Sequence, residues 1–130
     1  MAQGMTARAA SVPLPDQAPC VYCGLVADTI DHVPPSSIRP SLIAAGLARR
    51  YPFVEVPACR ECNVLLGASH GLTVPERKRY LKRRLRSRYA KYLRVPDWND
   101  YELGHLGPNL QRYIAAGLEK RRVAEDRLRW

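Results

Sequence analysis

The sequence predicts a small α+β domain followed by two helices, the first of which is strongly basic. The chain has 130 residues with 11 prolines and 8 glycines, and such frequent punctuation leaves room for only a small core. All four cysteines lie between residues 20 and 62, whereas a clear helical periodicity begins only after residue 73. We therefore expect a disordered tail over 1–18, a cysteine-containing module over 19–72 and a basic helical extension over 73–130.

The first 18 residues mix small, polar and proline residues without any period, which is typical of disordered segments. They lack the apolar centre of a secretory signal, and no stretch of the chain reaches the roughly 20 apolar residues of a membrane span. We expect a soluble, intracellular protein of the cytoplasm that has no membrane partner.

The cysteine-containing module alternates short elements with turns. Residues 41–50 read as a short helix between Pro40 and Pro52, and residues 53–56 alternate as a strand does. The expected order is strand or loop, helix, strand, and then a cysteine knuckle. The function of the 36–52 insertion cannot be read from its residues.

Two longer helices are expected in the extension. Thr73 and Glu76 form a capping-box pattern, and apolar residues recur at helical spacing up to Pro96, which predicts a helix over 74–95. Residues 97–108 are rich in turn formers and read as a connection. A second helix is expected over 109–128.

Net charge is +9 and the pI is near 9.8. Residues 1–74 carry five basic and five acidic side chains, so 16 of the 21 basic and 7 of the 12 acidic ones lie in residues 75–130. A neutral module joined to a cationic one indicates a polyanionic partner. Nucleic acid is the first expectation, and an anionic membrane surface is the alternative.

The cysteines form two C-x-x-C pairs. Each pair can fold as a tight knuckle, and two knuckles complete a tetrahedral Zn²⁺ site at Cys20, Cys23, Cys59 and Cys62. Two disulfides would suit a secreted chain, and a redox pair would need only one motif inside a βαβ unit. A zinc ion bound by four thiolates has no open position, so we expect it to be structural.

The candidate catalytic residues are therefore others. Asp31 and His32 lie between the knuckles, and Asn63 follows the fourth cysteine. C-x-x-C, then D-H-V-P, then C-x-x-C-N resembles the HNH, or His-metal finger, endonuclease family, and in particular its four-cysteine zinc branch typified by phage endonuclease VII. The matching motifs span residues 20–67. The asparagine that gives the motif its middle letter has no counterpart, because none occurs between Val33 and Ala58.

The resemblance implies a ββα-metal finger, in which a two-stranded hairpin packs on a helix with a catalytic ion at their junction. By matching position, His32 would be the general base, and Asp31 and Asn63 would bind a catalytic Mg²⁺ or Mn²⁺. Histidine suits proton transfer near neutral pH, and oxygen ligands suit a hard cation that stabilises charge on a phosphate. Taken one by one, the residues also fit structural roles, as a turn-forming Asp-His pair and a helix N-cap at Asn63.

Two other histidines remain. His70, in a glycine-rich turn, could reach the catalytic ion or the scissile phosphate, or it could be a solvated loop residue. His105 lies between two glycines, Gly104 and Gly107, and is expected to be structural.

The helix over 74–95 is expected to bind DNA. Ten cations on it face only one acid, Glu76, and a solvated helix usually mixes the two signs. A phosphate backbone would relieve their repulsion, without any sequence readout. The expected contacts are Arg77, Lys78, Lys82, Arg83, Arg84, Arg86, Arg88 and Lys91.

The sequence thus predicts a metal-dependent HNH endonuclease that hydrolyses DNA phosphodiester bonds. A phage or mobile-element origin, with phage packaging proteins as partners, follows by analogy only. The main alternative is a non-catalytic zinc module that binds nucleic acid, and a third possibility is a zinc-stapled protein that binds structured RNA.

Overall fold

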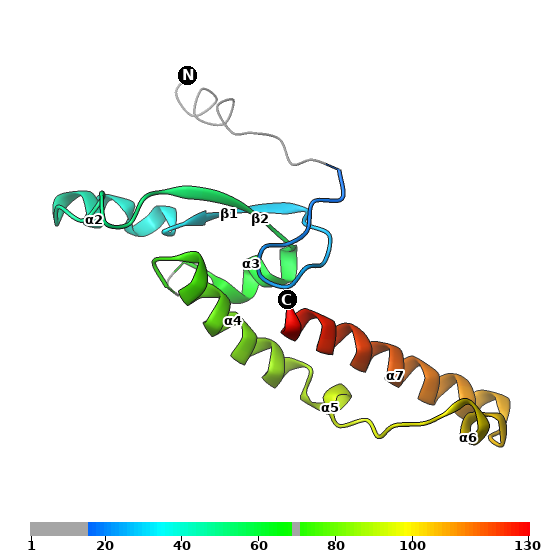
Figure 1. Ribbon diagram of the computed structural model, residues 1–130. Helices are drawn as coiled ribbons and strands as arrows, with labels where there is room; N and C mark the ends of the chain where they lie inside the picture. The colour runs from blue at the N-terminus through cyan, green and yellow to red at the C-terminus, as the bar shows by residue number, and fades with distance from the viewer. Residues whose placement is uncertain (1–15, 69–70) are drawn as a thin grey trace.

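A computed structural model describes residues 16–68 and 71–130, which form a mixed α/β fold (Figure 1). The sheet is a two-stranded antiparallel hairpin of β1 (Thr29–Val33) and β2 (Val54–Ala58). Its register pairs Thr29 with Ala58 and Val33 with Val54. β-Branched residues are frequent in both strands, as expected for a pleated and partly buried surface.

The connection between the strands carries η1 (Ser36–Ile38) and α2 (Arg39–Ala44), which lie at the far end of the hairpin from the cysteines (Figure 1). The expected helix over 41–50 therefore begins and ends earlier. Pro40 lies in its first turn, a position where the missing N–H costs nothing. The expected strand over 53–56 is longer at its C-terminal end and continues to Ala58.

Helix α3 (Arg60–Leu66) follows β2 directly and ends at Gly67, which has a φ of 58°. It packs against β1 and against α4 (Val74–Arg88). The Thr73 side chain accepts a hydrogen bond from the Glu76 N–H at the start of α4, which confirms Thr73 as the N-cap, while the Glu76 carboxylate accepts from the Thr73 hydroxyl group. The buried side chains of α4 are Arg77, Leu81 and Leu85.

The helix expected over 74–95 is interrupted at Tyr89 and continues as α5 (Ala90–Leu93). Tyr89 leaves the helical region with φ −105° and ψ 17°, while its hydroxyl group bonds to Glu61 of α3. This long-range contact lies outside any local pattern.

The expected connection over 97–108 contains α6 (Asp100–Gly104), which is stabilised by a full capping box between Asn99 and Glu102. Helix α7 (Pro108–Arg129) then returns along α5 and α4, so that the C-terminus lies beside α3 (Figure 1).

The core is small and includes every cysteine. Its other members are Tyr22, Ala58, Leu66, Leu81 and Leu85. Ala18, which was placed in the disordered tail, is buried, and its carbonyl accepts a hydrogen bond from Ala27. Residues 1–15 lie outside the described part of the chain.

Candidate metal centre and catalytic residues

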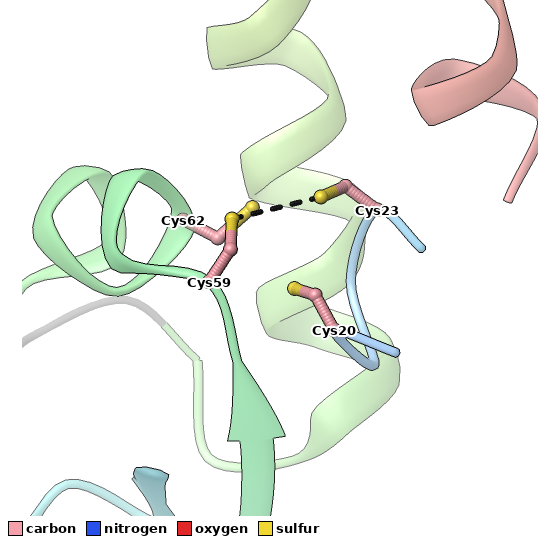
Figure 2. Close-up of side chains that lie close together, drawn as sticks. All are labelled: Cys20, Cys23, Cys59 and Cys62. Atoms are coloured by element: carbon pink, nitrogen blue, oxygen red, sulfur yellow. Dashed lines mark hydrogen bonds between the residues drawn. The ribbon is translucent and has the colours of Figure 1, made fainter. Parts of the chain in front are cut away.

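The four cysteines converge on one point (Figure 2). Cys20 and Cys23 come from the loop before β1, and Cys59 and Cys62 from the start of α3. All four are buried free thiols, and their sulfur atoms lie within 4.8 Å of one another. This arrangement can hold a metal ion, as the two knuckles predicted.

The thiols strongly perturb one another. Hydrogen bonds from Cys23, Cys59 and Cys62 lower the pKa of Cys20, whereas hydrogen bonding to Cys20 and Cys23 raises the pKa of Cys62. One thiolate is thus stabilised by its neighbours, while further negative charge in the cluster is opposed. A bound cation removes this conflict, because it stabilises all the thiolates at once.

Backbone geometry shapes the first knuckle. The Gly24 N–H donates to the Cys20 carbonyl at 2.9 Å, and Gly24 has a φ of 80°, where a side chain would be strained. A Cβ atom at Gly24 would also lie 2.6 Å from Cε3 of Trp130. The glycine therefore permits both the turn and the close approach of the C-terminal tryptophan.

A second C-terminal residue covers the cluster from α7. Arg127 Nη2 lies 3.7 Å from the Cys62 sulfur and 3.9 Å from the Cys59 sulfur, and Arg127 Nη1 donates to Glu61 Oε1 at 2.6 Å. A guanidinium group at this place compensates the negative charge of thiolates. No local pattern in the sequence signals this role of Arg127.

Asp31 lies on the face of β1 that packs on the helices, and it is buried. Arg77 donates to it twice, from Nε to Oδ2 and from Nη2 to Oδ1, both at 3.0 Å. The Tyr22 hydroxyl group also donates to Oδ2. Arg77 is fully buried, so its expected place on the DNA-binding surface is wrong. It is a partner of Asp31 instead.

His32 points to the other face of the hairpin, since successive side chains of a strand alternate. Its Nε2 lies 3.1 Å from Oε2 of Glu55, its cross-strand neighbour. The two side chains are 44% and 38% exposed. The imidazole is thus accessible and is oriented by a carboxylate that the sequence analysis did not single out.

Asn63 lies in the first turn of α3, beside β1. Its amide nitrogen donates to Thr29 Oγ1 at 3.1 Å and to the Ile30 carbonyl at 3.3 Å. Thr29 shares the face of Asp31, because the two residues are two positions apart on the strand. The structure therefore places Asp31 and Asn63 on the helix-facing side of β1, and His32 on the opposite side of the same strand.

Asp31 has little capacity left to bind the expected catalytic ion. A carboxylate offers about four lone-pair positions, and within the described residues the bonds from Tyr22 and Arg77 take three of those on Asp31. One position on Oδ1 is left, close to the guanidinium charge. Oxygen donors of this type suit a hard cation. Only one oxygen of Asp31 could bind it, and the positive charge of Arg77 would lower its affinity.

The remaining cations of α4 are mainly on its surface. Arg83, Arg84 and Arg86 are exposed, while Lys78 Nζ donates to the Trp130 carbonyl at 2.9 Å and Arg88 pairs with Glu61 at 2.7 Å. Lys91 is exposed on α5, and Lys82 is half-buried. His70 lies outside the described residues. His105 is exposed, and its Nδ1 lies 2.7 Å from the Tyr101 carbonyl.

Comparisons of the chain with protein-family models, with curated proteins and with solved structures find no match. None of the helices in the described part of the chain is long and apolar enough to cross a membrane.

Proposed function

We propose that this protein is a zinc-stapled, metal-dependent endonuclease of the HNH type that hydrolyses DNA. The observation that carries the proposal is His32, an exposed imidazole bonded to Glu55 on a hairpin that the cysteine cluster joins to α3. Asp31 and Asn63 lie on the same strand and the adjoining helix, and the cationic helix α4 follows in the chain.

Zinc is the ion proposed for the cysteine cluster. Four thiolates in two knuckles are a typical structural zinc site, and their softness disfavours magnesium or calcium. Each ligand is part of the core. The ion would fix the loop before β1 against the start of α3, and it would take no part in the reaction.

In the proposed reaction His32 is the general base. If Nε2–H donates to Glu55, the lone pair of Nδ1 is left to accept a proton from water. The resulting hydroxide attacks phosphorus, the bond to the 3′ oxygen breaks, and that oxygen leaves with a proton from solvent. A 5′ phosphate results. Glu55 would fill the orienting role for which the sequence offered no asparagine.

A divalent Mg²⁺ or Mn²⁺ ion held by Asp31 Oδ1 and Asn63 Oδ1 would stabilise negative charge on the phosphate and the leaving oxygen. This role requires the phosphate to reach both faces of β1, since His32 lies on the face opposite to these two ligands. Because Arg77 already neutralises Asp31, we expect the ion to bind weakly. Activity should therefore continue to rise into the millimolar range of magnesium.

DNA would be held by the exposed cations of α4 and α5. Arg79, Arg83, Arg84, Arg86 and Lys91 are all exposed, and phosphate contacts by such side chains supply affinity without sequence readout.

The test is plasmid nicking by zinc-loaded protein, with magnesium, with manganese and with excess chelator in parallel. The parent should nick only with added metal. His32→Ala should lose roughly 10²- to 10⁴-fold in rate while keeping its zinc and its thermal stability. His105→Ala is the matched control, since it removes an exposed histidine from the distant α6 end, and it should cut like the parent.

A second function is favoured by a specific observation, the buried bonds between Asp31 and Arg77. If these bonds serve only to join β1 to α4, the protein is a non-catalytic zinc module that binds nucleic acid. A parent that binds DNA but fails to nick it with either metal would establish this second function. A His32→Ala variant that cuts at the parental rate would instead overturn the general-base role of His32.

A further inference from the structure

A groove of about 590 Å³ lies between α5, the segment that follows it, and α7. Three aromatic side chains line it, namely Tyr92, Trp98 and Tyr113. Its volume falls within the range of small-molecule sites. None of the proposed catalytic residues lies in it.

The hollow exists because small residues of α7 face the chain opposite. Gly117 carries no side chain, and a Cβ atom built on it would lie 3.8 Å from a methyl group of Val95. Ala116 also lines the groove. The small size of these two residues leaves space between α7 and the segment after α5.

Positive charge converges on the same groove. The Nζ atoms of Lys91 and Lys120 each lie 5.0 Å from the ring centroid of Tyr92. The hydrogen bond from Lys120 lowers the pKa of the Tyr92 hydroxyl group, which is consistent with a positive local potential.

The neighbouring acids do not cancel this charge, because arginines hold them. Asp97 pairs with Arg121 at 2.6 Å, and Glu119 pairs with Arg122. The groove thus combines aromatic walls with two lysines, and the ligand complementary to it is both aromatic and anionic.

We infer that this groove binds an unpaired nucleotide of single-stranded DNA, with the base among the aromatic side chains and its phosphate at Lys91 and Lys120. Stacking of bases on aromatic side chains within a cationic groove is how single strands are held without sequence preference. A base in a duplex is already stacked and paired, so it cannot enter. The inference rests on the proposed DNA-binding function, and it adds a contact for a displaced or single strand.

Position along the chain supports this occupant. Helix α5 follows the cationic α4 after one residue, so Lys91 continues the row of cations that α4 presents. A strand whose phosphates follow α4 would reach Lys91 next and the groove after it.

The experiment measures binding of a labelled oligothymidine and of a labelled hairpin duplex by fluorescence anisotropy, with the full zinc-loaded chain. Tyr113→Ala removes a wall residue that is 78% exposed and should leave the fold intact. We expect it to weaken single-strand binding roughly 5- to 150-fold. Lys120→Gln should reduce the salt slope by about 0.7 for one lost phosphate contact. Neither variant should change duplex binding.

Matched controls are available on nearby elements. Tyr101→Ala removes a tyrosine of similar exposure, 76%, from α6 outside the groove, and Arg112→Gln removes an exposed cation of α7. Both variants should bind oligothymidine like the parent.

Parental single-strand affinity in Tyr113→Ala, or equal losses in Tyr101→Ala, would overturn the inference and leave the proposed function untouched. Binding of a labelled tyrosine-rich acidic peptide, without binding of oligothymidine, would show that the groove takes a protein segment and would overturn the inference too. A parent that binds neither DNA contradicts the DNA-binding proposal itself.

Discussion

Arg77 occupies the first position of the buried stripe of α4, followed at helical spacing by Leu81 and Leu85. The helical spacing alone predicts that Arg77 is buried, whereas its charge predicts that it is exposed. The presence of buried Asp31 across the core decides the matter, because a buried cation requires a buried partner. The sequence gives no sign that residues 31 and 77 meet.

We predict that Arg77→Met destabilises the zinc-loaded protein strongly, by about 3–5 kcal/mol, because it leaves the Asp31 carboxylate buried without its cation. Urea unfolding followed by circular dichroism measures this. Arg79→Met, an exposed change on the same helix, should stay within about 0.5 kcal/mol of the parent. A stable Arg77→Met variant would mean that Asp31 does not depend on the guanidinium group.

Asp31, His32 and Asn63 show which features of the candidate site could be predicted from the sequence. Their motif positions place them on one strand and one helix terminus, and the structure agrees. The alternation of the strand separates His32 from the other two, which a linear motif conceals. Glu55 was missed because cross-strand pairing depends on the hairpin register, and the long intervening segment hides that register from the sequence.

At the scale of elements, capping residues and apolar spacing correctly predicted where the long helices begin and end, apart from the break at Tyr89. The Thr73 cap and the apolar spacing fixed the start of α4, and the length of α7 differs from expectation by one residue at each end. The break at Tyr89 and helix α6 were not anticipated. The break coincides with the bond to Glu61 of α3, and α6 is only five residues long, too short for a periodic pattern.

Helix α4 should supply most of the nonspecific DNA affinity. Replacing Arg83, Arg84 and Arg86 together with glutamine should weaken duplex binding similarly on unrelated sequences. The slope of log affinity against log salt should fall by about 0.9 for each lost phosphate contact. Titrations at several salt concentrations measure both effects.

The matched control removes three cations outside α4, by changing Arg49, Arg50 and Arg112 to glutamine. These residues are exposed too, so the net charge falls equally. If this control flattens the salt slope as much as the α4 variant does, then net charge and not the position of α4 governs binding.

The attachment of α7 should depend on the metal ion. Arg127 contacts two of the cysteine sulfurs, and Trp130 lies against Gly24 in the first knuckle.

The attachment should also depend on pH through Glu61. Burial raises the pKa of Glu61, but hydrogen bonds from Tyr89 and Arg127 outweigh burial and lower it. A carboxyl group whose pKa is lower in the folded state than in the unfolded state stabilises the fold at pH values above the unfolded-state pKa. The contribution of Glu61 is therefore lost as the pH falls through its folded-state pKa.

We predict that chelation of the metal releases the C-terminal end of α7. In a Trp98→Phe background, Trp130 is the sole tryptophan, and its emission should shift to longer wavelength when zinc is withdrawn. Adding zinc back should reverse the shift. Unchanged emission in protein shown to have lost its zinc would contradict the coupling. Glu61→Gln should show weaker loss of attachment on acidification than the parent does.

At the scale of the whole molecule, the fold is organised around its cysteines. They contribute four of the nine residues of the buried cluster, and the hairpin, α3, α4 and α7 all meet there. The sequence could predict this centre because knuckle spacing is a local property. It could not predict that α7 closes over it, because those contacts join residues more than 60 positions apart.

Because the metal site is the core, binding of the ion should be inseparable from folding. Apparent zinc-binding free energies in small domains are about 10–16 kcal/mol, as large as the roughly 5–15 kcal/mol that stabilises a typical domain. Cys59→Ser should therefore abolish zinc binding and the cooperative thermal transition together, and DNA affinity should fall with the loss of the α4 platform. Val64→Ser changes a 70% exposed residue of the same helix and should keep its zinc, its transition and its affinity. His32→Ala should do likewise while losing only the proposed cleavage activity. Zinc content, melting curve and nicking rate together therefore separate the role of the cysteines from the role proposed for His32. A Cys59→Ser protein that melts cooperatively without zinc would mean that the hydrophobic residues around the cysteines suffice to hold the fold.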